Sequence, residues 1–242
     1  MTHFLGEVFG WFTTSAHWHG SDGIPHRMWE HSVMSIAAVA FALAIALPLG
    51  IWFGHRRRGG MVLMNVSNVG RALPSLAVLG LGQEALGLRG WPGFGARPAF
   101  IALLVLAIPP IVTNAYTGVS EVDPDVRESA LGMGMTGGQV LRRVELPLAL
   151  PLVMAGVRTS AVQVVATATL AAELSWGGLG RYIIDGIGRQ DNVMVFAGAL
   201  QVGVLALVTE VVLAAVQRRV VPKGLQSGEN VPSAVPADAR PR

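Results

Sequence analysis

The chain has 242 residues, of which 52% are hydrophobic and only 14% are charged, and its formal net charge is +3. A soluble domain of this length needs more charge to cover its surface, so the composition predicts an all-α polytopic membrane protein. The basic residues lie beside apolar segments rather than on one face, which argues against nucleic-acid binding, and the absence of cysteine excludes disulfides and thiol catalysis.

The first 31 residues are predicted to form an extracytoplasmic segment. Residues 4–12 are too few to span a membrane, and their aromatic and apolar composition suits a helix that lies in the outer interface. The segment lacks the basic start and cleavage site of a signal peptide, so we expect it to be retained. Its histidines lack the spacing and accompanying acids of a metal site, so no metal is expected; they are His17, His19, His26 and His31.

Five apolar segments are long enough to cross a bilayer at about 1.5 Å per residue. They cover residues 32–54, 61–86, 99–119, 148–172 and 193–217. The second is interrupted by Arg71 and Pro74. The third contains Pro109 and Pro110, which a membrane helix tolerates only where neighbouring helices or waters satisfy the freed carbonyls. The predicted organisation is a membrane domain over residues 32–219 and a disordered cytoplasmic tail over residues 220–242.

The distribution of positive charge sets the expected orientation. With the N-terminus outside, alternating spans place the three basic segments in the cytoplasm, in agreement with the positive-inside rule; these segments cover residues 56–58, 127–143 and 218–223. An even number of spans would leave one basic end on the wrong side. The C-terminus is therefore expected to be cytoplasmic.

A polar loop over residues 121–147, between the third and fourth spans, is the most informative part of the sequence. Residues 123–125 read Asp-Pro-Asp, which indicates a helix start, because acidic residues suit the positive end of the helix dipole. Small side chains at Ser129 and Ala130 would let a partner surface approach closely. Leu146 and Pro147 are expected to end a short second helix and to start the fourth span. The glycines that allow a sharp reversal between the two short helices are Gly132, Gly134, Gly137 and Gly138.

The spacing within this loop resembles the EAA signature of ABC-importer permeases, which reads E-A-A-x-x-x-G and, nine residues later, I-x-L-P. The positions that match identically are Glu128, Ala130, Gly134, Leu146 and Pro147. Ser129 stands in place of alanine and Val144 in place of isoleucine. The resemblance implies the type I importer fold, with this loop as a coupling helix that docks in a groove of a cytoplasmic ATPase subunit. An ordinary cytoplasmic loop is the alternative.

Further segments resemble one branch of this family, the permeases of importers for glycine betaine, carnitine or choline. They lie at residues 47–50, 71–77, 155–159, 167–172 and 177–180, and the resemblance as a whole covers residues 30–217. Methionine permeases share several of these segments, so a permease for methionine or another small solute is the alternative. The resemblance also implies the inner membrane of a prokaryotic cell as the location.

Partners follow from the same resemblance: two cytoplasmic ATPase subunits, an extracytoplasmic substrate-binding protein, and a second permease that is either an identical copy or a sister chain. The sequence contains no phosphate-binding G-x-x-x-x-G-K-[ST] loop and no Ser-His-Asp set. We therefore expect no enzymatic activity and no bound cofactor in this chain, with ATP and Mg used by the partner ATPase. A secondary transporter, the alternative of a different class, usually has more spans or internal repeats than this sequence shows.

Arg71, Arg158 and Glu210 fall within the predicted spans, where each costs on the order of 2.5–3.5 kcal/mol at a helix centre. Arg158 and Glu210 both lie about 10–12 Å from the cytoplasmic edge. They could form an ion pair, Arg158 could instead snorkel to the inner headgroups, or either could contact substrate. Arg71, Pro74 and Ser75 mark either a broken helix beside the pathway or a packing kink. Because an arginine repels cations, Arg71 should point away from a cationic substrate.

An outer loop follows the fourth span. Trp176, Gly177 and Gly178 can bend sharply there, which makes them candidates for an outer gate. For Trp176 we favour a place in the aromatic belt of the membrane surface, or plain packing.

Overall fold

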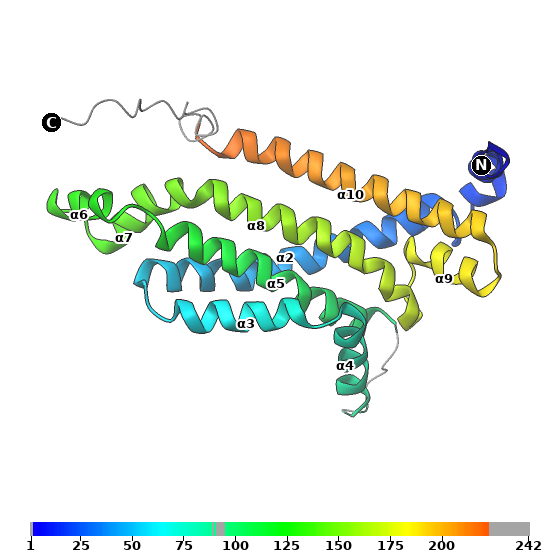
Figure 1. The fold of residues 1–242 in the computed structure, drawn as a ribbon, viewed down its shortest axis with the longest axis horizontal. Helices are drawn as coiled ribbons and strands as arrows, with labels where there is room; N and C mark the ends of the chain where they lie inside the picture. The colour runs from blue at the N-terminus through cyan, green and yellow to red at the C-terminus, as the bar shows by residue number, and fades with distance from the viewer. Residues whose placement is uncertain (1, 89, 91–94, 223–242) are drawn as a thin grey trace, which may run out of the picture.

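The computed structural model describes residues 2–88, 90 and 95–222, and every regular element within them is helical, which confirms the predicted all-α fold. The α-helices, 3-10 helices (η1, η3) and π-helix (η2) follow one another along the chain as Figure 1 shows. Their bounds are α1 Thr2–Thr13, η1 Ser15–Trp18, α2 Ile24–Arg56, α3 Gly60–Ala72, α4 Ser75–Gly87, α5 Ala96–Ser120, α6 Pro124–Gly132, α7 Gly137–Val140, η2 Leu141–Glu145, α8 Leu146–Thr167, η3 Ala168–Leu174, α9 Gly180–Gly188 and α10 Asn192–Val220.

Four helices in the described part of the chain are long and apolar enough to cross a membrane, and they coincide with four of the predicted spans. They are α2, α5, the continuous run Gly137–Leu174 that contains α8, and α10. α2 begins at Ile24, well before the predicted start at residue 32. Pro25 suits the first helical turn, and Arg27 pairs with Glu30 one turn later, so the charges of this segment do not stop the helix.

The second predicted span is a bent pair of helices and not one straight rod. Segments Gly60–Gly70 and Ser75–Gly87 differ in direction by 93°, and Figure 1 shows α4 leaving the bundle. Leu73 is extended at the break because Pro74 disfavours the helical conformation of the residue before it. With 13 residues, each half is about 20 Å long, shorter than the hydrocarbon core. The described residues thus hold four spans, or five if the pair counts as one.

Small residues allow α2 and α5 to approach closely at the centre of the bundle. On α2 they recur every fourth position, and they are Ala38, Ala42, Ala46, Gly50 and Gly54. A methyl group at Gly50 would lie 2.7 Å from the Cβ atom of Ala115 on α5, so the helix spacing requires glycine there. α8 packs on the other side of α5, where the hydroxyl of Ser160 donates to the carbonyl of Ala107 at 2.8 Å.

The basic segments gather at one end of the bundle. α6 and α7 lie there, together with the C-terminal ends of α2 and α10, whereas α1 and α9 lie at the opposite end (Figure 1). The predicted orientation needs this arrangement, because all basic segments must face the same side of a membrane. α10 continues to Val220, and the rest of the predicted tail, residues 223–242, lies outside the described residues.

The helix predicted for residues 4–12 is present as α1. It packs on α10 through an edge contact between the rings of Phe4 and Phe196, whose centroids are 5.5 Å apart. It also contacts α9, where the rings of Trp11 and Tyr182 meet at 5.4 Å. α1 is therefore attached to the end of the bundle opposite α6 and α7.

Candidate functional site

The signature loop folds as two short helices joined by a tight turn. Asp123 caps α6 by accepting a hydrogen bond from the N–H of Asp125 at 2.8 Å. At α7 the N–H of Thr136 donates to Gln139 Oε1, also at 2.8 Å, within a capping box. Gly134 has a φ of +85° and makes the reversal. The prediction that four glycines share the reversal is wrong, because the other three lie inside helices; these are Gly132, Gly137 and Gly138.

The two small residues of the signature differ in their exposure. Ser129 is exposed, as is Glu128 before it, whereas Ala130 is only 2% exposed. The carbonyl of Ala130 accepts a hydrogen bond from the N–H of Met135 at 3.2 Å, which holds the turn against α6. The expectation that Ser129 and Ala130 together admit a partner is therefore wrong for Ala130, which fills the inside of the loop.

Large apolar side chains on the same loop project into solvent, and the sequence pattern did not predict them. Val126 and Leu131 are exposed, and Met133 is 74% exposed. Exposed apolar side chains on a loop outside the membrane spans are typical of a protein-binding surface. The sequence does contain a sign of them: large apolar residues occur on a short polar helix that lies outside the predicted spans.

The helix does not end at Leu146 and Pro147. α7, the π turn η2 and α8 run on as one continuous helix from Gly137 to Leu174, so the predicted helix end is wrong. Pro147 lacks an N–H, and its ring would clash with the carbonyl of Arg143 in a regular helix. The widened π turn precedes it, where the N–H of Leu146 donates to the carbonyl of Leu141. The second half of the signature loop, α7 and the π turn, is thus continuous with α8.

A buried carboxylate joins the loop to α2. Glu145, in the π turn, is 0% exposed; His55 Nδ1 lies 2.5 Å from its Oε2 atom and Arg127 Nε 3.2 Å from its Oε1 atom. Arg127 Nη2 also donates to the carbonyl of His55 at 3.3 Å. Arg57 adds a second tie by donating to the carbonyl of Val122 at 2.5 Å. Because a buried carboxylate without a partner is costly, α2, α6 and the π turn are held together.

Arg158 and Glu210 form an ion pair between α8 and α10. Arg158 Nη1 also donates to Gln217 Oε1 at 2.7 Å, which fixes the guanidinium against α10. Of the alternatives that the sequence left open, the structure contains the ion pair. Contact of either residue with substrate stays a prediction.

The bend between α3 and α4 contains the other pathway candidates. Arg71 lies in α3, and its side chain is outside the described part of the structure. Pro74 is exposed and precedes α4, and Ser75 is half-buried in the first turn of that helix. The structure therefore has a broken helix at this place, and its role in the pathway stays a prediction.

The outer loop is attached to α2 through a carboxylate. The N–H of Gly178, whose φ is +80°, donates to Glu30 Oε2 at 2.8 Å. Arg27 Nη1 donates to the same oxygen at 2.9 Å. A Cβ atom at Gly177 would lie 2.1 Å from it, so the Glu30 carboxylate could not keep this position beside a larger residue. Trp176 packs on the interior of the bundle, which favours plain packing over an aromatic belt, and its role as a gate stays a prediction.

Tyr182 attaches α9 to the segment that precedes α2. Its hydroxyl donates to the carbonyl of Asp22 at 2.6 Å. Burial raises the pKa of the Tyr182 phenol to about 12, and nearby Asp22 adds to the effect. The phenol therefore stays protonated and able to donate at neutral pH.

The N-terminal histidines all contact neighbouring atoms of this chain. His17, His19 and His31 each place a ring nitrogen 2.8 Å from a backbone carbonyl oxygen. His26 lies 3.4 Å from Glu30 Oε1. Within the described ranges no three side chains of histidine or acidic residues converge on a possible metal site.

A match to a known family extends over the membrane helices. The sequence model of the family described as "Binding-protein-dependent transport system inner membrane component" matches residues 46–222, which include the whole signature loop. The chain belongs to this family. It is a permease and a multi-pass membrane protein, in agreement with its spanning helices.

Named relatives of this permease resemble it along most of their length. The glycine betaine/carnitine/choline transport system permease protein OpuCB of Bacillus subtilis is 38% identical, over 85% of this chain and 92% of the relative. The choline transport system permease protein OpuBB of the same organism is 37% identical, over 83% and 90%. The osmoprotectant import permease protein OsmW of Salmonella typhimurium is 34% identical, over 81% and 91%.

Solved structures confirm the ABC-importer permease fold. A chain of the MetNI methionine ABC transporter, in an inward-facing conformation, has a TM-score of 0.71 at 21% identity, covering 82% of this permease and 96% of that chain. A chain of an amino acid ABC transporter solved with histidines has a TM-score of 0.62 at 19% identity, covering 77% and 91%. Permeases of ABC importers are subunits distinct from the ATPase and work with an ATPase and a substrate-binding protein.

Proposed function

We propose that this permease imports a quaternary-ammonium osmoprotectant such as glycine betaine, carnitine or choline. The observation that carries the proposal is the set of relatives named for these solutes, which are 34% to 38% identical over most of both chains. The methionine and amino acid transporters among the solved structures are only 19% to 24% identical, so they support the fold alone. A methionine permease is therefore the weaker alternative.

The ATPase docks on the loop over residues 121–147. Exposed Glu128, Ser129 and Met133 support this placement, because they offer an anionic, a small and an apolar contact on one loop. ATP and Mg are bound by the ATPase subunits and no cofactor by this chain. The binding protein docks at the end that carries α1 and α9, and the second permease is an identical copy or a sister chain.

Transport proceeds by alternating access. Closure of the ATPases on ATP carries the docked loop inward. Because α7, the π turn and α8 form one continuous helix, a displacement of the loop moves α8 with it as one body. The contacts of Glu145 with His55 make α2 follow. The helices then reorganise from an inward-facing to an outward-facing state, and hydrolysis resets them.

The basic end of the bundle, with α6 and α7, lies in the cytoplasm, and the N-terminus lies outside. The positive-inside rule supports this orientation. In it, the loop of Trp176, Gly177 and Gly178 lies at the outer mouth, near the docking place of the binding protein. The C-terminal end of α10 lies on the cytoplasmic side.

Uptake by the complete importer in liposomes tests the proposal. The permease is reconstituted with its ATPase and binding protein, and uptake of labelled glycine betaine, carnitine, choline and methionine is measured with and without ATP. We expect ATP-dependent uptake of at least one quaternary-ammonium solute. Uptake of methionine alone would support the alternative substrate, and ATP-independent uptake by the permease alone would support a secondary transporter.

A further inference from the structure

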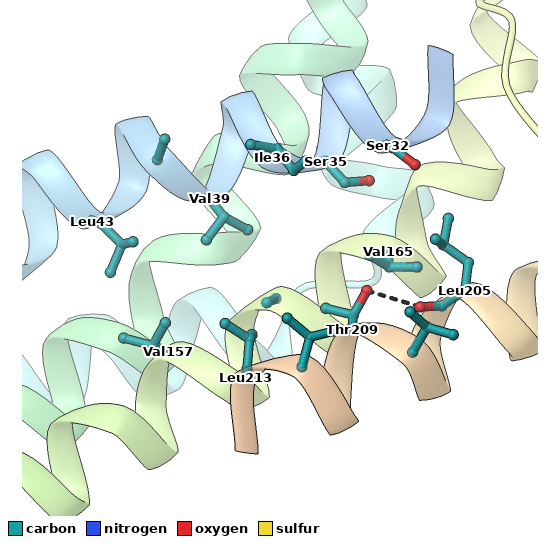
Figure 2. Close-up of a pocket in the computed structure, with 14 residues that line it drawn as sticks. Ser32, Ser35, Ile36, Val39, Leu43, Val157, Val165, Leu205, Thr209 and Leu213 are labelled. Carbon is teal, nitrogen blue, oxygen red and sulfur yellow. Dashed lines mark hydrogen bonds between the residues drawn. The ribbon is translucent and has the colours of Figure 1, made fainter. Parts of the chain in front are cut away.

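Two open grooves run along α8 and α10, on different faces of this helix pair. The first, between α2, α8 and α10, has a volume of about 390 Å³. Figure 2 shows that aliphatic side chains such as Val157 and Leu213 line it, and that the hydroxyl of Thr209 donates to the carbonyl of Leu205 at 2.8 Å. Apart from Ser32 and Ser35 on α2 the walls are aliphatic, and Thr209 is satisfied within its own helix, so the groove suits a largely apolar occupant.

The second groove is polar. Its volume is about 560 Å³, and its lining residues are Ala155, Arg158, Thr159, Val162, Gln163 and Glu210. Among the described residues, the hydroxyl of Thr159 and the side-chain amide of Gln163 have no hydrogen-bond partner. Unsatisfied polar groups and an ion pair are not tolerated against lipid tails, so this face is not turned to lipid.

We propose that the second groove is a transit subsite for zwitterionic solutes within the translocation pathway; this rests on the proposed function. Glu210 faces the quaternary ammonium group of the solute, and Arg158 donates to its carboxylate. In the structure the two side chains pair with each other. A zwitterion brings both opposite charges, so the pair can exchange partners without leaving either charge unpaired.

The surroundings of the pair suit this exchange. Gln217 holds Arg158 through Nη1, while Nη2 is the atom that meets Glu210 and can change partner. The lining contains no aromatic ring, so no cation–π cage forms here and recognition is ionic. A pathway site must release its solute, which weak ionic binding permits. The groove volume of about 560 Å³ is that of an ordinary small-molecule site.

Cysteine labelling tests whether the groove is filled with water. The chain has no cysteine, so single substitutions label cleanly. Thr159→Cys and Gln163→Cys are made in the complete importer in liposomes and treated with a trimethylammonium-ethyl methanethiosulfonate. We expect both to react at least ten-fold faster than Val208→Cys, which lies in the apolar groove, and glycine betaine to slow the reaction. Equal rates in all three variants would overturn the proposal.

Solute selectivity tests the roles of the two charges. Arg158→Gln should lower uptake of glycine betaine and carnitine at least ten-fold and that of choline, which lacks a carboxylate, less than three-fold. Glu210→Gln should lower uptake of all three solutes. Arg181→Gln, which removes an ion pair with Asp185 outside the groove, is the matched control and should leave the ratio of betaine uptake to choline uptake unchanged.

The outcomes separate the two proposals. Equal losses of betaine and choline uptake in Arg158→Gln would make the pair structural and would overturn the subsite. A wild-type importer that moves none of the three solutes contradicts the proposed function instead, and the labelling rates then still decide whether the groove is a water-filled path.

Discussion

The two ends of α2 are both held by a carboxylate, but in different ways. At the end beside α6 and α7, which is the inner end in the proposed orientation, Glu145 is 0% exposed and its partners, His55 and Arg127, come from α2 and α6. At the outer end the Glu30 side chain is 21% exposed and is bound by Arg27, three residues earlier on the same helix, and by the amide of Gly178. Water can replace a lost partner at the outer end but not at the inner end. The contacts of Glu145, the inner joint, therefore suit transmission of a movement of the signature loop to α2. The contacts of Glu30, the outer contact, can break and form again.

The largest effect is expected from the inner carboxylate. Glu145→Ala leaves Arg127 and His55 without their acceptor beside a cavity, and loss of one partner from a buried ion pair costs about 3–5 kcal/mol. The unfolding temperature of the purified permease should fall accordingly. Glu145→Gln, which preserves the shape, should leave ATP hydrolysis by the complete importer active while solute uptake falls.

Glu121→Ala is the control for this change, because Glu121 is exposed in the same connection. It should alter stability by less than about 0.5 kcal/mol. If Glu145→Ala unfolds at the wild-type temperature, the contacts of Glu145 do not stabilise the permease.

A smaller effect is expected from a methyl group at the outer contact. In Gly177→Ala the new Cβ atom would lie 2.1 Å from Glu30 Oε2, so the Glu30 carboxylate must shift and its bond from the Gly178 N–H weakens, at a cost of about 1 kcal/mol. Gly188→Ala is the matched control, because nothing lies within 4 Å of that Cβ position. Thermal unfolding of both variants measures the difference, and equal unfolding temperatures would contradict the tight contact.

Removal of the outer charge alone should cost less. In Glu30→Gln the amide oxygen can still accept from the Gly178 N–H, and the lost ion pair with Arg27 is partly solvated, so we expect a loss of about 1 kcal/mol or less. Thermal unfolding of Glu30→Gln and Glu145→Gln, measured side by side, tests the order. A larger loss for Glu30→Gln would reverse the comparison between the two ends.

The smallest effect is a pH dependence at the outer end. Because burial raises the pKa of the Tyr182 phenol to about 12, its contribution to stability is complete below pH 10 and is lost as the pH rises towards 12. The unfolding temperature of the wild type should therefore fall across this range more than that of Tyr182→Phe. Parallel curves for the two proteins would show that Tyr182 titrates normally.

The spans, the loop and its signature could be predicted from sequence, because hydropathy, charge and spacing are local properties. The bend of 93° and the π turn could not, since both are local adjustments to a proline whose geometry depends on packing. The contact between Glu145 and His55 could not be predicted either, because the two residues are 90 positions apart in the chain. Ala130 was misjudged for a related reason: the turn at Gly134 folds back over it, and a spacing pattern does not reveal which side faces inward.

Cross-linking of the signature loop tests the central claim most directly. The chain has no cysteine, so a maleimide photo-cross-linker can be attached at a single introduced site, in Ser129→Cys, Met133→Cys or Ala130→Cys, within the complete importer. The account predicts links to the ATPase subunit from positions 129 and 133, and few from position 130, which is 2% exposed. No link from position 129 or 133, or an equal yield from position 130, would contradict it.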